Sequence, residues 1–264
     1  MATSTLKYAF DPNRGIATLT FNRPDSLNAL DMAMAGAFRE AVSHLTHQAG
    51  LRCVVLRGAG RAFMAGGDIA SMAGGPGPAR QTVTTLLNAL NPAILELRQL
   101  DAPVIAGVHG VAAGAGFSIA LLADIVVAAE SARFLIGYNG IGAVPDCGGS
   151  WFLPNRIGAG RAAEMMILGH TLTAQQARDW GLVGTVAADD RFEEELDAMV
   201  TRAATGPGRA IGAFRRLTDQ AHGISLADHL EAERQAFLGI TDSDDFNEGV
   251  AAFLEKRTPR FQGR

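Results

Sequence analysis

The sequence predicts an α/β fold in which pairs of strands alternate with helices, followed by a C-terminal helical region. Two observations predict this fold. An order of two strands and a helix occurs twice before residue 124 and recurs more loosely up to residue 169, whereas helical patterns alone follow the GPGR segment at 206–209. We therefore expect a core domain of residues 1–200 and a helical region of residues 201–264, which the length of 264 residues allows.

The first unit begins with a predicted β-hairpin. Its strands are LKYAF at 6–10 and IATLTF at 16–21, and the DPNRG between them consists largely of turn-forming residues. Apolar residues then recur at helical spacing across residues 27–48, which predicts a helix. The run CVVLRGAG at 53–60 predicts a buried strand. A turn, AFMAGGD, and a segment expected to be flexible, GGPGP, precede a second predicted helix at 80–99.

The second unit contains the most apolar part of the chain. PVIAGVHG predicts a buried strand, and GAGFSIALLAD predicts a glycine turn that leads into an apolar helix. Because no charged residue lies between Asp101 and Asp124, a membrane span is the first alternative. Pro103, His109 and four glycines within this stretch disfavour that alternative. We therefore expect a buried interior and no membrane association.

The third unit is less regular than the first two. DIVVAAE at 124–130 predicts a strand, residues 133–158 are rich in loop-forming residues, and a helix is expected at 160–169. The C-terminal region ends in a predicted helix around residues 248–257.

Composition excludes several classes of function. Apolar residues make up 48% of the chain and charged residues 19%, as in ordinary globular proteins. The net charge is −4 and the basic residues are scattered, so nucleic acid is not an expected partner. Cys53 and Cys147 belong to no CxxC or Cys/His cluster, so neither a metal site nor a disulfide framework is predicted. With no apolar segment behind a basic N-terminus, we expect a cytoplasmic protein.

Two glycine turns are candidates for an oxyanion-binding site. AGGD at 65–68 and GAG at 114–116 each follow a predicted strand and precede a predicted helix. Such turns can leave backbone N–H groups free, and two converging N–H groups stabilise a thioester oxygen that gains negative charge. Gly67 and Ala115 are the natural donors. The alternative is that both turns are simple strand-to-helix connections.

Five segments of the chain resemble the crotonase, or enoyl-CoA hydratase/isomerase, superfamily over essentially its whole length. The resemblance implies a spiral of ββα units and an acyl-CoA thioester substrate. Coenzyme A is then part of the substrate, and no separate cofactor is expected. The resemblance also implies a homotrimer or a dimer of trimers, with residues 201–264 as the trimerisation region. The five segments are FNRPDSLNAL (21–30), RAFMAGGD (61–68), VHGVAAGAGFSIALLAD (108–124), GAVPDCGGSWFLP (142–154) and AAFLEKR (251–257).

The resemblance also assigns roles to individual residues. Gly67 and Ala115 match the oxyanion donors of the superfamily, which are the two residues that the glycine turns indicate. Phe253 and Lys256 match positions that reach coenzyme A across a subunit contact. The remaining positions expected to line the substrate site are Ser26, Leu27, Ala65, Asp68, Ile69, Ser118 and Tyr138.

The acidic residues distinguish between the reactions of the superfamily. Hydratases carry two glutamates, and their positions fall on Ser118 and Tyr138, which hydrogen-bond but are poor bases at neutral pH. PDCGG instead places Asp146 where isomerases have an aspartate that moves a proton. Superfamily dehalogenases use that position as a nucleophile, but they usually have tryptophan where this chain has Tyr138. Without the resemblance, a helix N-cap is the simplest interpretation of Asp146.

The residues around Asp146 are largely apolar, and we expect them to remove its carboxylate partly from water, which would favour proton transfer. The neighbours concerned are Val144, Cys147, Trp151 and Phe152.

The predicted function is therefore an acyl-CoA isomerase that shifts a double bond or rearranges a ring. Within the superfamily, the sequence most closely resembles the 1,2-epoxyphenylacetyl-CoA isomerases of phenylacetate degradation, followed by the Δ3,Δ2-enoyl-CoA isomerases. An enoyl-CoA hydratase is the alternative. Two further hypotheses are a non-catalytic protein that binds coenzyme A thioesters or RNA and a serine hydrolase at Ser118. The hydrolase is suggested by GFSIA, close to a nucleophile-elbow motif, with His170, His222 or His229 as base.

Overall fold

A computed structural model describes residues 4–264, and two β-sheets organise the part of the chain before residue 190. The larger sheet has the strand order β1-β2-β3-β4-β6-β9, and the smaller has the order β5-β7-β8. The strands of the larger sheet are β1 (Leu6–Asp11), β2 (Ile16–Phe21), β3 (Cys53–Gly58), β4 (Val104–Val108), β6 (Ile125–Ala129) and β9 (Thr185–Ala187). Those of the smaller sheet are β5 (Val111–Ala113), β7 (Arg133–Leu135) and β8 (Thr171–Thr173).

Helices follow the strands and then continue alone to the C-terminal end. They are α1 (Met32–Leu45), α2 (Pro76–Gln99), α3 (Ala115–Leu122), α4 (Gly149–Leu168), α5 (Ala174–Asp179), α6 (Phe192–Ala204), α7 (Gly208–Gln220), α8 (Leu226–Thr241) and α9 (Asp244–Leu254). Short 3-10 turns include η1 (Pro24–Ser26), η2 (Ile69–Met72) and η3 (Tyr138–Ile141).

The predicted ββα order is confirmed as a spiral. β1 and β2 form the predicted antiparallel hairpin, and the strands from β2 to β9 in the larger sheet run parallel. After each of β3, β4 and β6 the chain adds an element to a second layer and then enters a helix. That element is β5 after β4, β7 after β6, and a single bridge from Met64 to Ala112 after β3.

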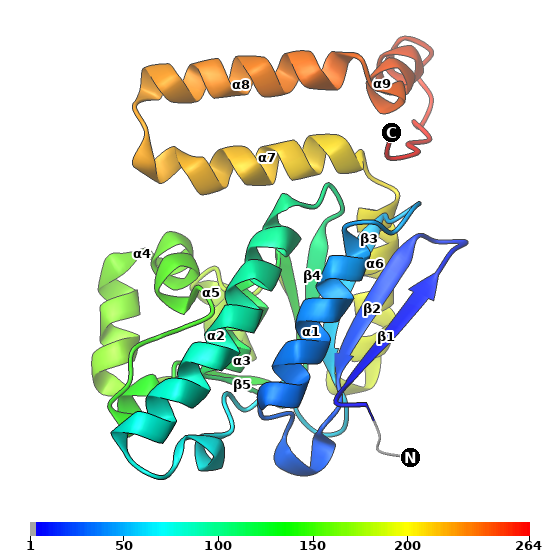
Figure 1. Ribbon diagram of the computed structural model, residues 1–264. Coiled ribbons are helices and arrows are strands. Elements are labelled where there is room, and N and C mark those ends of the chain that lie inside the picture. The colour runs from blue at the N-terminus through cyan, green and yellow to red at the C-terminus, as the bar shows by residue number, and fades with distance from the viewer. Residues whose placement is uncertain (1–3) are drawn as a thin grey trace.

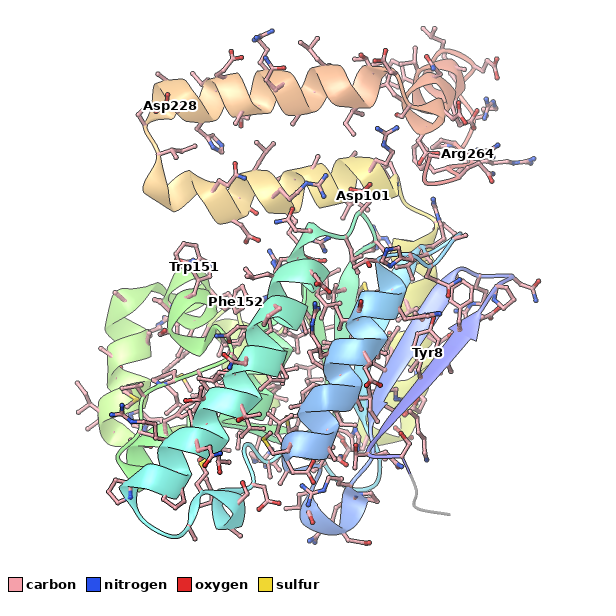
Figure 2. The ribbon with its side chains drawn as sticks, viewed as in Figure 1. Tyr8, Asp101, Trp151, Phe152, Asp228 and Arg264 are labelled. Atoms are coloured by element: carbon pink, nitrogen blue, oxygen red, sulfur yellow. The ribbon has the colours of Figure 1, made fainter. Side chains whose placement is uncertain are left out.

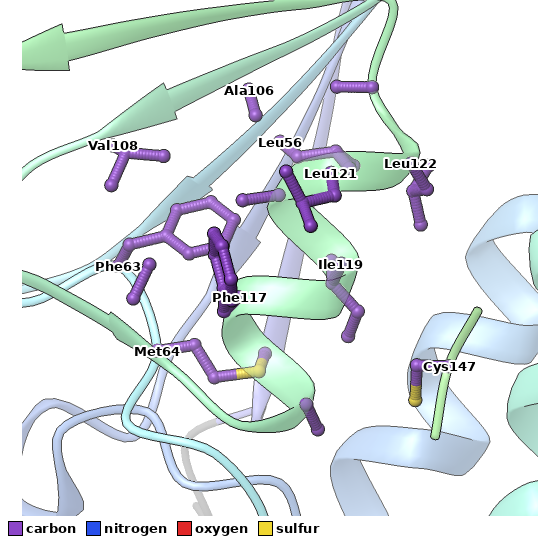
Figure 3. Close-up of a cluster of buried hydrophobic side chains, with 14 of the residues drawn as sticks. Leu56, Phe63, Met64, Ala106, Val108, Phe117, Ile119, Leu121, Leu122 and Cys147 are labelled. Atoms are coloured by element: carbon purple, nitrogen blue, oxygen red, sulfur yellow. The ribbon is translucent and has the colours of Figure 1, made fainter. Parts of the chain in front are cut away.

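Helices cover both faces of the larger sheet (Figure 1). α1 and α2 lie on one face, and α6 packs on the other through residues such as Phe192 and Leu196. α3 lies inside the spiral, where all eight of its residues are buried. Figure 3 shows its side chains Phe117, Ile119 and Leu121 in a cluster with residues of the sheet layer.

The uncharged stretch between Asp101 and Asp124 is therefore protein interior. It forms β4, β5 and α3 in succession, so no single helix spans it. Among residues 4–264, no helix is long and apolar enough to cross a membrane.

Two predicted helices begin elsewhere than expected. The helix predicted over 27–48 is α1, which starts at Met32 because the Asp31 side chain accepts the N–H of Met34 as an N-cap. The GGPGP segment is partly helical, contrary to the predicted flexible loop. Pro76 occupies the first position of α2, where its missing N–H costs no hydrogen bond.

In the third unit, the structure differs more from the prediction. Its helix, predicted at 160–169, begins at Gly149 as α4. Gly158 interrupts α4 with φ 79° and ψ 156°, and this break divides the helical pattern that the sequence presents. The last helix, predicted around 248–257, spans 244–254 as α9.

A buried arginine joins α7 to the spiral. The Arg215 guanidinium donates to the Asp124 carboxylate at 2.6 Å and to the backbone carbonyl of Arg98 at 3.0 Å. α8 and α9 lie beyond α7, at the top of Figure 1. Residue 200 falls inside α6, which packs on the sheet, so the division into 1–200 and 201–264 stays a prediction.

Candidate active site

A cavity of about 770 Å³ lies between the two glycine turns, α2 and the loop before α4. Asp146 is the only carboxylate among the described residues that line it. The lining is otherwise mostly apolar or backbone, and such a cavity suits an acyl group. The apolar side chains that line it include Ile69, Met72, Val83, Leu87, Leu135, Ile141 and Val144.

The two glycine turns lie side by side at this cavity. Met64 pairs with Ala112 in a parallel bridge. Because the two segments run in the same direction, the residues two positions further along, Gly66 and Gly114, also lie against each other. Both glycines have positive φ, 108° and 52°, and a Cβ on Gly114 would lie only 3.5 Å from the Cα of Gly66. The next residues, Gly67 and Ala115, therefore line the cavity together.

The N–H groups of Gly67 and Ala115 are available to a ligand. Neither donates a hydrogen bond to any residue in the described range 4–264. Ala115 is the first residue of α3, where backbone N–H groups have no partner within the helix. The carbonyl of Gly114, on the same peptide group, accepts the N–H of Ser118 at 3.0 Å and thereby fixes the orientation of the Ala115 N–H.

The predicted segment around Ser26 and Leu27 lies against the first glycine turn. The Ala65 N–H donates to the Leu27 carbonyl at 3.0 Å. Leu27 has a left-handed backbone with φ 49°, which follows the short helix that ends at Ser26. The structure thus places Leu27 beside Ala65, which lines the cavity, whereas Ser26 and Leu27 are not among the described residues that line it.

A buried asparagine holds this edge in place. The Asn28 amide donates to the carbonyls of Ala59, Ala62 and Phe63, and its side-chain oxygen accepts the N–H of Arg23. Asn28 is fully buried with φ 58°, a left-handed conformation that asparagine tolerates better than most residues.

Asp68 and Ile69 differ in their relation to the cavity. Ile69 is half exposed and lines it. The Asp68 carboxylate instead accepts from Arg23 at 3.1 Å, and Arg23 also pairs with Asp31 at 3.2 Å. Asp68 therefore stabilises the turn through an ion pair and is not among the residues that line the cavity.

The Asp146 side chain does not cap a helix. α4 has Gly148 at its N-cap without a side-chain cap bond, and only the backbone oxygen of Asp146 accepts from Gly149. The Asp146 carboxylate accepts the Tyr138 hydroxyl at 2.5 Å and lines the cavity half-buried. The next residue, Cys147, has φ 49°, a left-handed backbone conformation that is strained for residues other than glycine.

Tyr138 and Ser118 continue inward from Asp146. The Tyr138 hydroxyl lies 3.2 Å from the Ser118 Oγ, which in turn lies 3.3 Å from the Gly114 carbonyl oxygen. Burial, reinforced by the Asp146 charge, raises the pKa of Tyr138 well above its usual value, so the phenol stays protonated. Ser118 is 1% exposed, and Gly149 makes room for it, since a Cβ there would lie 2.4 Å from the Ser118 Oγ.

The predicted apolar enclosure of Asp146 is wrong for two of its four members. Trp151 and Phe152 lie on the part of α4 that faces α7, where they line a separate cavity with Arg98 (Figure 2). Asp146 belongs to the loop before α4, whereas Trp151 and Phe152 lie in the first turn of that helix, so closeness in sequence does not place them around the carboxylate. Val144 lines the active-site cavity but is 78% exposed, and only Cys147 is buried.

Phe253 and Lys256 are not brought to the site within one chain. Phe253 is 83% exposed on α9, and Lys256 follows the end of that helix with φ 55°. Neither is among the residues that line the cavity.

The structure contradicts a serine hydrolase at Ser118. Ser118 lies in the middle of α3, away from the strand-to-helix turn that the motif requires. His170 contacts Glu164 at 3.2 Å, and His229 lies 3.5 Å from Glu233, so neither forms a pair with Ser118. The side chain of His222 lies outside the described part of the structure.

Residues of α2 were missed as site residues by the sequence analysis. Val83, Leu87 and Asn91 line the cavity from one face of α2. Their spacing of four residues indicates a common helical face, but apolar spacing alone does not distinguish a cavity wall from core packing.

The comparisons with known proteins agree with this architecture. The family model described as enoyl-CoA hydratase/isomerase matches residues 11–264. A 1,2-epoxyphenylacetyl-CoA isomerase of Escherichia coli is 38% identical over 95% of this chain and 96% of its own. A probable enoyl-CoA hydratase of Rhodobacter capsulatus is 37% identical over the full length of both chains.

A solved structure extends the similarity to three dimensions. An enoyl-CoA hydratase of Mycobacterium smegmatis superposes with a TM-score of 0.88 at 33% identity, covering 98% of this chain and 99% of its own. The sequence match spans nearly all the residues, and the relatives include both an isomerase and hydratases. The chain therefore belongs to the enoyl-CoA hydratase/isomerase family, whose members are enzymes that act on acyl-CoA thioesters.

Proposed function

We propose that the protein is an acyl-CoA isomerase in which Asp146 moves a proton and the N–H groups of Gly67 and Ala115 bind the thioester oxygen. The observation that carries this proposal is the position of Asp146, the only carboxylate among the described residues that line the cavity shared with both N–H groups. One carboxylate suffices for isomerisation, because the same group removes a proton and later returns it.

The reaction follows from this arrangement. With a 3-enoyl thioester, the Asp146 carboxylate takes a proton from C2, and the electrons of that C–H bond move into a dienolate whose charge rests largely on the thioester oxygen. Two fixed N–H donors stabilise this charge without reorganisation. The protonated Asp146 then delivers the proton to C4, which leaves the double bond between C2 and C3. Atoms and charge balance, so the proposed reaction needs no cofactor.

Hydration of a 2-enoyl thioester is the rival reaction, and two of the similar proteins above carry hydratase names. It requires one group to activate water and a proton donor for C2. Tyr138 and Ser118 are buried and protonated, and Tyr138 is held in a hydrogen bond to Asp146. These features support isomerisation over hydration.

The proposal is tested with 3-hexenoyl-CoA deuterated at C2. We expect conversion to 2-hexenoyl-CoA, with part of the deuterium recovered at C4, because one carboxylate carries the proton between the two carbons. Mass spectrometry and NMR of the product measure the transfer. Crotonyl-CoA serves as the hydratase substrate and 1,2-epoxyphenylacetyl-CoA as a ring substrate. Hydration of crotonyl-CoA faster than isomerisation of hexenoyl-CoA would overturn the proposal.

We also propose that the subunits form a homotrimer or a dimer of trimers through α7, α8 and α9. α8 has no buried residue in the single chain, and large apolar side chains are exposed along all three helices. Such a surface is typical of a protein interface. In this assembly Phe253 and Lys256 would reach coenzyme A bound to a neighbouring subunit. The exposed apolar residues include Phe214, Leu226, Leu230, Phe237, Leu238, Phe253 and Leu254.

Sedimentation equilibrium tests this assembly. We expect a mass of three or six chains for the unmodified protein and a shift toward smaller species for Phe253→Asp, because a charge at the contact must be desolvated. Ile167→Asp on α4 is the matched control, since Ile167 is 75% exposed and lies outside the three helices. An unmodified protein that sediments as a monomer at micromolar concentration would contradict the proposal.

A further inference from the structure

A chain of hydrogen-bonding groups connects Asp146 to the oxyanion turn. It runs from the Asp146 carboxylate to the Tyr138 hydroxyl at 2.5 Å and then to the Ser118 Oγ at 3.2 Å. It ends at the Gly114 carbonyl oxygen, 3.3 Å from the Ser118 Oγ. That carbonyl and the Ala115 N–H belong to one planar peptide group, so the chain joins the proposed proton carrier to a proposed oxyanion donor.

The number of hydroxyl protons decides how this chain is arranged. Each hydroxyl has a single proton to donate. The Tyr138 proton points to the Asp146 carboxylate, so the Ser118–Tyr138 contact is made with Ser118 as donor. In that arrangement, the Gly114 carbonyl accepts from the Ser118 backbone N–H but not from its hydroxyl.

Protonation of Asp146 favours the opposite arrangement. A neutral carboxyl group accepts a hydrogen bond less strongly than a carboxylate, so the Tyr138 hydroxyl can turn toward Ser118. Ser118 can then donate to the Gly114 carbonyl. Both changes are rotations of O–H bonds and leave the heavy atoms in place. A second hydrogen bond to that carbonyl polarises the peptide and makes the Ala115 N–H a stronger donor.

We propose that Ser118 and Tyr138 are positioning residues that couple proton uptake by Asp146 to the strength of the Ala115 oxyanion donor. The coupling strengthens the donor when the enolate is present, because the enolate forms as Asp146 becomes protonated. Such an interaction, stronger in the intermediate than in the ground state, accelerates the reaction. The inference rests on the proposed function of Asp146.

The surroundings of the two hydroxyl groups suit this role. Ser118 is 1% and Tyr138 7% exposed, so water does not compete readily for their protons. Gly149 lies directly beside Ser118, since a Cβ added to it would lie 2.4 Å from the Ser118 Oγ. The phenol retains its proton, since burial and the Asp146 charge raise the pKa of Tyr138.

Kinetics of three variants test the coupling. Tyr138→Phe is expected to lower kcat for 3-hexenoyl-CoA by about 10- to 100-fold, the effect of losing a hydrogen bond to a charged group. Ser118→Ala is expected to lower it by about 3- to 10-fold, because the Ser118 hydroxyl contacts only neutral groups, and KM should be nearly unchanged in both variants. The double variant should lose little more than the worse single variant, because the two groups act as one unit. Tyr8→Phe and Ser131→Ala, both at exposed positions, are the matched controls.

Ligand binding separates this inference from the proposed function. Acetoacetyl-CoA, which ionises to an enolate, should bind Ser118→Ala about tenfold more weakly than the unmodified protein, whereas hexanoyl-CoA should bind both equally. The coupling would be overturned, even if isomerisation is observed, by either of two results. One is that Ser118→Ala and the unmodified protein bind acetoacetyl-CoA with equal affinity, and the other is that the losses in kcat of the two single variants add up in the double variant. Absence of isomerisation together with the expected affinities would overturn the proposed function alone.

Discussion

Asp146→Asn is expected to lower isomerisation of 3-hexenoyl-CoA by about 10²- to 10⁴-fold, the usual contribution of a general acid–base group. Asparagine has the same shape and can accept the Tyr138 hydroxyl, but it cannot carry the transferred proton. The affinity for saturated hexanoyl-CoA should be unchanged, because no proton moves when that ligand binds. Steady-state kinetics and calorimetric binding measure the two quantities.

Asp190→Asn is the control for this substitution. Asp190 is exposed and lies outside the cavity, and its substitution by asparagine removes one negative charge, as Asp146→Asn does. It should retain full activity. If Asp146→Asn isomerises the substrate as fast as the unmodified protein, Asp146 does not carry the proton and the proposed function is wrong.

Ala115→Pro is expected to lower kcat by about 10²- to 10³-fold, as loss of one oxyanion donor does in other enzymes. Proline removes the N–H of residue 115 and nothing else that is polar. Because Ala115 is the first residue of α3, proline is tolerated there and no intrahelical hydrogen bond is lost. Kinetics, together with circular dichroism to monitor folding, provide the measurement.

Met32→Pro tests whether proline at a first helical position disturbs the protein in general. Met32 begins α1, is 41% exposed, and its N–H has no partner among the described residues. This variant should remain folded and active. A folded Ala115→Pro protein with unchanged kcat would exclude the Ala115 N–H from the oxyanion site.

Short apolar runs in the sequence predicted β1, β2, β3, β4 and β6, and the family resemblance implied the spiral, whereas the three-residue strands β5, β7, β8 and β9 were not predicted. Gly67 and Ala115 could be named because a glycine turn between a strand and a helix leaves N–H groups without partners. Figure 3 shows why the assignment of α3 was secure: Phe117, Ile119 and Leu121 all point into packed surroundings, so the segment can only be interior.

Other features of the site depend on contacts between distant residues and could not be predicted. The Arg23–Asp68 ion pair joins positions 45 residues apart, and the Asp146–Tyr138 hydrogen bond depends on the backbone path of a loop. Trp151 was misplaced because α4 begins at Gly149, after Asp146, and its first turn directs Trp151 to the cavity near α7. The start of α4 was missed because its glycines and Pro154 disfavour a helix locally, whereas packing against α3 supports it.

Gly149 has an evolutionary consequence. Its missing side chain leaves the space that the Ser118 Oγ occupies, since a Cβ at residue 149 would lie 2.4 Å from that oxygen and 3.2 Å from Pro145 Cβ. The side-chain volumes tolerated at positions 118 and 149 therefore depend on each other. A side chain at 149 requires a smaller residue at 118 or a shift of the backbone. Because no residue is smaller than glycine, a bulkier acid at 118 gains no space from a substitution at 149 and requires a shift of the start of α4.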